Sequence, residues 1–197
     1  MRHSTHLVIM GVAGVGKSTI AAGVAKALGW AFADADDFHS AGNLAKMRSG
    51  AALNTADREP WLESIRLWID ERGREGISTV TACSVLRREY RDVLQRATGT
   101  VAFVHLVGSR DIIARRMASR PNHFMPVSLL VSQFAQLEPL EPDESGISID
   151  TELAPDEIVK RVVRYVGTLA ETDSTVSEQS TEAQINRQRD VKGATSP

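Results

Sequence analysis

A glycine-rich stretch near the amino terminus has the residue types and the spacing to bind phosphate. It reads Gly11-Val12-Ala13-Gly14-Val15-Gly16-Lys17-Ser18, which fits the pattern G-x-x-x-x-G-K-S. Glycines allow the backbone to curl so that successive N–H groups point into one concavity, where an anion can sit. We expect Lys17 to reach the outer phosphates and the Ser18 hydroxyl to ligate Mg²⁺. The stretch, extended by Thr19, therefore predicts a nucleotide-binding site.

The flanks of this stretch agree with that interpretation. Residues 7–10 form a short apolar run typical of a buried parallel strand. Residues 19–28 place Ile20, Val24 and Leu28 on one helical face. Strand, glycine loop and helix then follow in the order that puts a phosphate at a helix N-terminus. A glycine-rich turn that binds nothing is the alternative, and these flanks argue against it.

Two carboxylates follow the second predicted strand, which spans residues 30–33. Asp34 and Asp36 lie two positions apart, so on an extended segment both side chains would point to the same side. In an open α/β sheet, ligands bind beyond the carboxyl ends of the strands. One carboxylate could hold Mg²⁺ or its water, and the other could accept a hydroxyl proton. An acidic loop that only ends the strand is the alternative, which the nearby phosphate loop disfavours.

Other polar residues are candidates for binding a small acceptor. Arg58 and Arg87 have the planar fork that matches a carboxylate, although a solvated helix face is the usual position of an arginine. His39, His123 and Gln133 are candidates for hydrogen bonds to a polyhydroxy substrate, although each alone is more often a surface residue.

A basic helix is predicted to carry a lid. Arg116 and Arg120 lie four positions apart and share a helix face. The segment 121–126, which contains two prolines, follows as a flap. Arginines on a closing lid can neutralise charge on a transferred phosphoryl group. A basic surface helix without a function is the alternative.

Composition limits the classes of protein to consider. A net charge of −2 over 197 residues gives no support for a nucleic-acid surface. No stretch is long and apolar enough to span a membrane, and a single cysteine, Cys83, suits the reducing cytoplasm. Predicted strands and helices alternate, which indicates an α/β fold with a parallel sheet and helices on both faces. We expect one domain over residues 1–170, and a polar, disordered tail over 171–197.

Several segments together resemble the small gluconate kinases of the P-loop kinase superfamily. The resemblance rests on the phosphate loop, on Asp-Ala-Asp-Asp-Phe-His at 34–39, and on the run from Cys83 to Asp92. It continues through the segment around Arg116 and Arg120 and the helix that follows, and it covers about residues 6–170. The phosphate loop is common to many NTPases, whereas the other segments in combination are much more specific.

The resemblance implies a fold, an activity and residue roles. The fold would be a P-loop NTPase fold with a five-stranded parallel sheet, helices on both faces and a small lid. The activity would be transfer of the ATP γ-phosphate to the 6-hydroxyl of D-gluconate, usually in a homodimer. The implied roles are phosphate binding by Lys17, Mg²⁺ binding by Ser18 and Asp34, hydroxyl activation by Asp36, lid contacts to adenine and phosphates by Arg116 and Arg120, and substrate binding by His39, Arg58, Arg87, His123 and Gln133.

Three alternatives stay open at this point. A kinase of another acceptor, such as shikimate or a nucleoside monophosphate, would share the phosphate loop. A nucleotide-dependent switch would need no acceptor, and the pairing of Asp34 and Asp36 with lid arginines argues against it. A nucleic-acid-binding NTPase would need a basic surface, which the composition lacks.

Overall fold

The centre of the fold is a five-stranded parallel sheet. The computed structural model describes residues 4–51, 53–118 and 127–170, without the side chains of 127–129. The strands are β1 (Thr5–Met10), β2 (Ala31–Asp34), β3 (Thr79–Ala82), β4 (Thr100–Val107) and β5 (Gly146–Asp150), in the order β2-β3-β1-β4-β5. Leu7 of β1 pairs with Val80 on one side and Ala102 on the other. The parallel sheet expected from the sequence is therefore confirmed.

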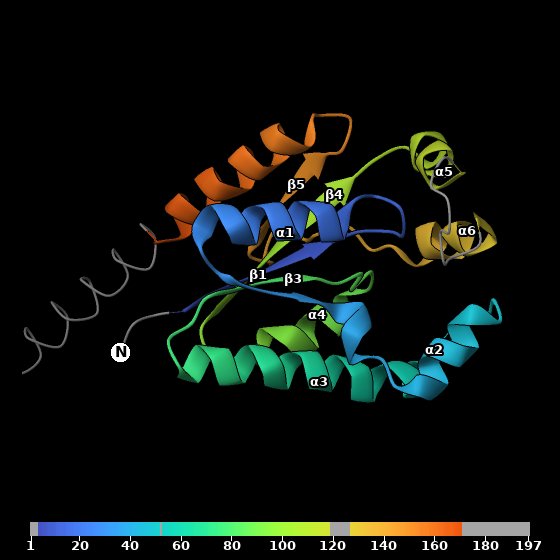
Figure 1. Cartoon of the computed structure of the whole chain (residues 1–197), viewed down its shortest axis with the longest axis horizontal. Helices are drawn as coiled ribbons and strands as arrows, with labels where there is room; N and C mark the ends of the chain where they lie inside the picture. Colours follow the sequence, from blue (N-terminus) through green and yellow to red (C-terminus); the bar gives the residue numbers. More distant parts are fainter. Residues whose placement is uncertain (1–3, 52, 119–126, 171–197) are drawn as a thin grey trace, which may run out of the picture. The chain divides into compact units, whose positions relative to one another are not determined.

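Helices cover both faces of the sheet. The helix α1 (Lys17–Leu28) lies on one face and contacts β1, β2 and β3 (Figure 1). The helices α3 (Thr55–Arg74) and α4 (Arg88–Gln95) lie on the opposite face, where α3 contacts β1 and α4 contacts β4. A buried cluster that includes Val8, Ile65 and Phe103 joins this second layer to the sheet. Burial of these apolar side chains stabilises the layered arrangement.

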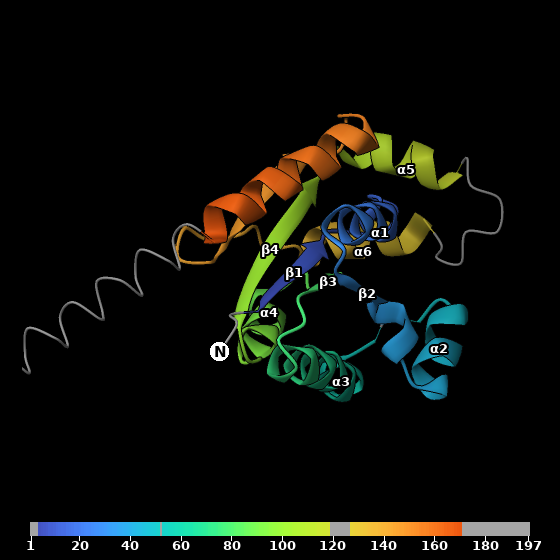
Figure 2. The same ribbon diagram turned by 60° about the vertical axis from the view of Figure 1, so that its left-hand side comes forward.

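Shorter helices gather near the ends of the strands. They are the 3₁₀ helix η1 (Ala35–Phe38), α2 (Ala41–Arg48), α5 (Arg110–Ala118) and α6 (Val127–Gln136). Both views place α2 near the start of α3, and α5 contacts α6 (Figure 2). The predicted flap at 121–126, with Arg120 and His123, falls outside the described residues, whereas α5 and α6 on either side of it are described.

One helix boundary differs from the sequence interpretation. The residues 54–60 resemble a turn because they include Asn54 and Pro60, yet α3 already begins at Thr55. Asn54 and Asp57 form a capping box, in which each side chain accepts a hydrogen bond from the other residue's backbone N–H, at 2.9 and 2.8 Å. This reciprocal cap stabilises the first turn, and the helix continues through Pro60.

The chain divides into two units, residues 1–160 and 161–197. A helix over residues 155–170 crosses this boundary, and its residues 161–170 are the described part of the second unit. The predicted polar tail, 171–197, lies outside the described residues. In the part of the chain that is described, no helix is both long and apolar enough to span a bilayer.

A buried histidine lies near the amino-terminal ends of the strands β1 and β3. The His6 side chain is 0% exposed, with Nδ1 2.9 Å from Thr79 Oγ1 and Nε2 3.1 Å from Ser4 Oγ. Burial lowers the pKa of His6 below its ordinary value. Burial likewise lowers the pKa of His39 and of His105, and neighbouring arginines add to that effect. The folded protein therefore keeps these imidazoles neutral at pH values where the unfolded chain binds protons.

We predict that stability falls as the pH drops through about 6.5, the ordinary histidine pKa. Below that pH the unfolded chain binds more protons than the folded one, so acid favours unfolding. His6→Gln retains hydrogen-bonding groups for Thr79 and Ser4 but does not titrate. Thermal unfolding between about pH 7.5 and 5.5, on either side of that pKa, should show a smaller drop in Tm for this variant. An equal drop in both proteins would contradict the assignment to His6.

Candidate functional site

The glycine-rich loop joins β1 to α1 in the form that a phosphate site requires. Gly11, Gly14 and Gly16 have φ of 135°, 79° and 107°, in the region that favours glycine. Gly16 is the N-cap of α1, and no side chain in the described part of the chain caps that helix terminus. The backbone N–H groups of the first turn are thus directed at the loop's concavity, where they and the helix dipole favour an anion.

Lys17 supplies the cation of this loop. Its Nζ donates to the Val12 carbonyl at 3.1 Å. Burial lowers the pKa of Lys17, and the carboxylates of Asp36 and Asp34 act in the opposite direction. A partly buried ammonium ion interacts more strongly with a nearby phosphate than an exposed one, because less water competes for it.

Ser18 and Asp34 bring two oxygen ligands together beside the loop. Ser18 Oγ donates to Asp34 Oδ2 at 2.6 Å. A hydroxyl and a carboxylate are the hard oxygen donors that Mg²⁺ prefers, and Mg²⁺ bound with phosphates usually takes only one or two protein ligands. These residues therefore fit a Mg²⁺ ion that accompanies a nucleotide.

The structure corrects the expectation that Asp34 and Asp36 lie side by side on an extended segment. The strand β2 ends at Asp34, and residues 35–38 turn into η1. Asp34 caps this turn, because its Oδ1 accepts from the Asp36 N–H at 3.1 Å. Aspartate readily caps such turns through its short side chain. The two carboxylates consequently separate: Asp34 faces Ser18, whereas Asp36 lines an adjoining pocket.

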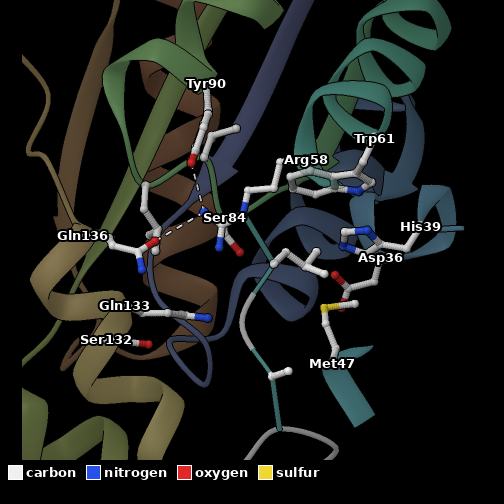
Figure 3. Close-up of a pocket in the computed structure, with 14 residues that line it drawn as sticks. Asp36, His39, Met47, Arg58, Trp61, Ser84, Tyr90, Ser132, Gln133 and Gln136 are labelled. Atoms are coloured by element: carbon white, nitrogen blue, oxygen red, sulfur yellow. Dashed lines mark hydrogen bonds between the residues drawn. The ribbon is translucent and has the colours of Figure 1, made fainter. Parts of the chain in front are cut away.

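The pocket lies beside the phosphate loop and receives side chains from several elements (Figure 3). Its empty volume, which includes the space on its open side, is about 740 Å³. Polar groups converge on it from η1, α3, α4 and α6 (Figure 3). The lining residues are Asp36, His39, Met47, Ala51, Leu53, Arg58, Trp61, Ser84, Val85, Leu86, Tyr90, Ser132, Gln133 and Gln136.

Arg58 is held in the wall of this pocket. Its Nη1 donates to the Tyr90 hydroxyl at 3.1 Å and to Gln136 Oε1 at 3.3 Å. The guanidinium carbon also lies 5.4 Å from the centre of the Tyr90 ring. These contacts fix the orientation of a permanent cation, which suits recognition of a carboxylate.

His39 offers a polar atom that has no partner among the described residues. Its ring stacks on Trp61 with 4.5 Å between centroids and 11° between planes, and Trp61 Nε1 donates to the Ala35 carbonyl at 2.7 Å. His39 Nδ1 is buried without a hydrogen bond in this part of the chain. Burial and, to a lesser degree, Arg58 lower the pKa of His39. A neutral imidazole with an unsatisfied nitrogen is suited to bind a polar ligand.

Asp36 is the candidate proton acceptor. Burial and the Asp34 carboxylate raise the pKa of Asp36, and Lys17 partly opposes them. Asp36 nevertheless remains accessible to solvent, as a pocket-lining residue must be. A carboxylate with a raised pKa is a stronger base than an ordinary aspartate, and this one lies in the same pocket as the candidate ligand-binding groups.

Not every predicted residue joins the pocket. Arg87 is outside the lining, with Nη1 2.8 Å from Glu89 Oε1 and its guanidinium 5.8 Å from the Tyr90 ring centre. Arg116 donates from Nη2 to the Thr151 carbonyl at 2.6 Å, next to the end of β5. Gln133 lines the pocket and accepts from the Ala13 N–H at 2.6 Å, which links α6 to the phosphate loop.

Sequence reasoning missed several pocket residues. Trp61 looks like a core residue and is indeed 8% exposed, but one face of its ring supports His39. Tyr90 and Gln136 give no chemical signal until the fold brings them to Arg58. The spacing of Gln133 and Gln136 was the one available hint, because residues three apart share a helix face. Cys83 is 1% exposed, and burial raises its pKa to about 12.

Comparisons with known proteins match most of the chain. The family model described as shikimate kinase matches residues 13–167. The gluconokinase of Gluconobacter oxydans is 42% identical over 159 residues, which are 81% of this chain and 89% of that protein. A gluconokinase structure from Sinorhizobium meliloti has 38% identity and a TM-score of 0.79, covering 90% of this chain and 99% of that one.

Other solved structures extend the comparison. A sugar kinase of Janibacter sp. is 49% identical, with a TM-score of 0.81 over 83% of this chain and 95% of that one. The shikimate kinase of Aquifex aeolicus covers 85% of this chain and 98% of its own at only 15% identity and a TM-score of 0.54. That last likeness shows a shared fold alone.

Gly14 lies directly against Met117 of α5, and this packing generates a prediction. A Cβ on Gly14 would fall 2.3 Å from Met117 Cγ, at a φ of 79° that alanine rarely adopts. Gly14→Ala should therefore displace the loop and weaken ADP binding about tenfold or more, given about 1–3 kcal/mol for such a strained residue. The added substitution Met117→Ala removes the clash and should restore part of the affinity. Calorimetric titration with ADP checks this, and no recovery in the double variant would contradict the clash.

Proposed function

We propose that this chain, which belongs to the family described as shikimate kinase and within it to the gluconokinases, phosphorylates D-gluconate at the 6-hydroxyl. The reaction consumes ATP and yields ADP and 6-phospho-D-gluconate. The observation that carries the choice of acceptor is the pocket beside the phosphate loop, where Arg58 is fixed, His39 Nδ1 has no hydrogen-bond partner among the described residues, and Asp36 has a raised pKa.

The chemistry of gluconate suits these three groups. The molecule has a carboxylate at one end and a primary hydroxyl at the other, with secondary hydroxyls between them. The guanidinium of Arg58 would hold the carboxylate, because a planar fork matches it. His39 and the amide of Gln133 would form hydrogen bonds with the secondary hydroxyls. Together these contacts would direct the 6-hydroxyl to Asp36.

Asp36 would accept the proton of the gluconate 6-hydroxyl while the oxygen of that hydroxyl attacks the γ-phosphorus of ATP. Phosphoryl transfer needs mainly positioning and charge stabilisation, so the precise orientation of this hydroxyl matters as much as its deprotonation. Lys17 and the backbone N–H groups of residues 11–19 would hold the phosphates. Ser18 and Asp34 would hold Mg²⁺, which neutralises charge on the phosphate oxygens when bound.

The lid, the assembly and the location stay predictions. Arg116 and Arg120 are proposed to contact adenine and phosphates, and His123 to help bind gluconate. Closure of the lid would exclude water and limit ATP hydrolysis. A homodimer and a cytoplasmic location are also proposed, from the resemblance and from the single cysteine.

A shikimate or nucleoside monophosphate kinase is the nearest alternative. The shikimate kinase model supports the fold of such an enzyme. The relatives named gluconokinase, at about 40% identity over most of the chain, favour gluconate instead.

We predict that ADP release with ATP and Mg²⁺ rises only when D-gluconate is added. Shikimate and nucleoside monophosphates should have no effect. Asp36→Asn is the matched inactive control: it should lower kcat about a hundredfold to ten-thousandfold, the usual contribution of a general base, with ADP affinity retained. The coupled measurement of ADP, with identification of the phosphorylated acid by mass spectrometry, tests the proposal. Stimulation by shikimate alone, or none by any acceptor, would overturn it.

The two arginines allow a second prediction about the acceptor. Arg58→Ala should raise the KM for gluconate about tenfold to a hundredfold, the usual effect of losing hydrogen bonds to a charged group. The KM for ATP should stay nearly constant. Arg87→Ala removes a cation that lies outside the pocket lining and pairs with Glu89, so its effect should be much smaller. A rise in the ATP KM for Arg58→Ala would show that this residue does not belong to the acceptor site.

A further inference from the structure

A buried ion pair lies behind the wall of the pocket. Arg91 of α4 is 0% exposed and is among the largest fully buried side chains of the described residues. Its Nε and Nη2 donate to the two carboxylate oxygens of Glu144, at 2.5 and 2.7 Å. The Glu144 side chain is also 0% exposed. Burial alone would raise the pKa of Glu144, but the hydrogen bonds from Arg91 and from the Glu141 N–H lower it.

Arg91 also donates hydrogen bonds to the backbone carbonyls of two separate loops. Nη1 donates to the carbonyls of Val85 and Leu86 at 3.4 Å each and to that of Glu138 at 3.0 Å. Nη2 also donates to the Pro139 carbonyl at 3.2 Å. One guanidinium therefore ties the loop between β3 and α4 to the segment that follows α6.

The first of these loops forms a wall of the pocket. Ser84, Val85 and Leu86 all line it. Val85 has a φ of 27°, an uncommon backbone conformation for a β-branched residue. Such a conformation persists only where the surroundings hold it, and the Val85 carbonyl is held by Arg91.

The second segment continues the helix that carries the other polar groups of the pocket. The Glu138 N–H donates to the Leu86 carbonyl at 2.8 Å, so the two loops are also joined directly. Upstream in α6, Gln136 contacts Arg58 and Gln133 contacts the phosphate loop. A shift of residues 138–139 would therefore reach both the acceptor cation and the nucleotide loop.

We propose that Arg91 and Glu144 form a positioning pair that sets the shape of the acceptor pocket. The inference rests on the proposed function of that pocket, because its effect is expected on gluconate. Neither side chain touches the cavity. The pair acts through the backbone of residues 85–86 and 138–139, which it holds at a fixed separation.

The energetics of buried ion pairs provide a test that separates positioning from stability. Replacing such a pair with apolar residues of similar volume often leaves stability unchanged or higher, whereas removing one partner is strongly destabilising. Arg91→Met with Glu144→Leu therefore leaves no buried charge unpaired, and it removes the donor of the four carbonyls. Arg91→Lys keeps the charge for Glu144, but a single ammonium with three donors lacks the fork that serves both loops.

We expect Arg91→Lys and the Met/Leu double variant to raise the KM for gluconate about tenfold, the effect of about 1.4 kcal/mol. The KM for ATP should rise less than the KM for gluconate, because the pair holds the wall of the acceptor pocket directly and reaches the phosphate loop only through Gln133. Asp70→Asn is the matched control, because Asp70 is a buried carboxylate of α3 whose side chain is 6% exposed and which lies outside the pocket lining. It should lower the Tm without changing the KM for gluconate.

Amide hydrogen exchange of the protein without ligands supplies a readout independent of turnover. Peptides covering residues 84–91 and 138–144 should exchange faster in Arg91→Lys and in the double variant, and not in Asp70→Asn. A double variant with a Tm and a gluconate KM like those of the wild type would overturn the inference, as would unchanged exchange in both segments. If the wild type shows no gluconate-dependent turnover, the proposed function fails, and the exchange rates alone still decide whether Arg91 holds these loops.

Discussion

The arrangement of the site depends on one constraint of topology: all five strands are parallel. Each strand therefore delivers the loop that follows it to the same edge of the sheet. The loop after β1 becomes the phosphate loop, the turn after β2 carries Asp34 and Asp36, and the loop after β3 forms a wall of the pocket. Residues from distant parts of the sequence meet at this edge because of the topology, before any specific side-chain contact is considered.

Charge balance then defines the centre of the site. Two pKa values show this balance: the carboxylates of Asp36 and Asp34 oppose the effect of burial on the pKa of Lys17, and Lys17 opposes the effect of burial on the pKa of Asp36. Asp34 is committed to Ser18 and to the turn, which leaves Asp36 for the pocket. The two carboxylates are of the same residue type, and the 3₁₀ turn gives them different positions.

Local signals predicted the frame of the molecule well. The glycine spacing, the apolar run before it and the periodic helix after it are short-range features that each specify their own conformation. The roles of residues that depend on tertiary contacts could not be predicted as well from the sequence. Trp61 has the pattern of a core residue, Arg58 and Arg87 have the same chemistry, and nothing around Arg91 in the sequence indicates that Glu144, 53 positions away, is its partner.

The start of α3 at Thr55 was hard to predict because of Pro60, although Asn54 and Asp57 have the spacing of a cap. Residues 119–126, where Arg120 and His123 lie, stay a matter of prediction.

The most direct measurement is a crystal structure of the protein with D-gluconate and a non-hydrolysable ATP analogue. The account predicts that the carboxylate of gluconate lies on Arg58, that His39 Nδ1 hydrogen-bonds a secondary hydroxyl, and that the 6-hydroxyl lies between Asp36 and the γ-phosphate. Gluconate bound in the reverse orientation, with its carboxylate at Asp36, or bound outside the pocket would contradict it.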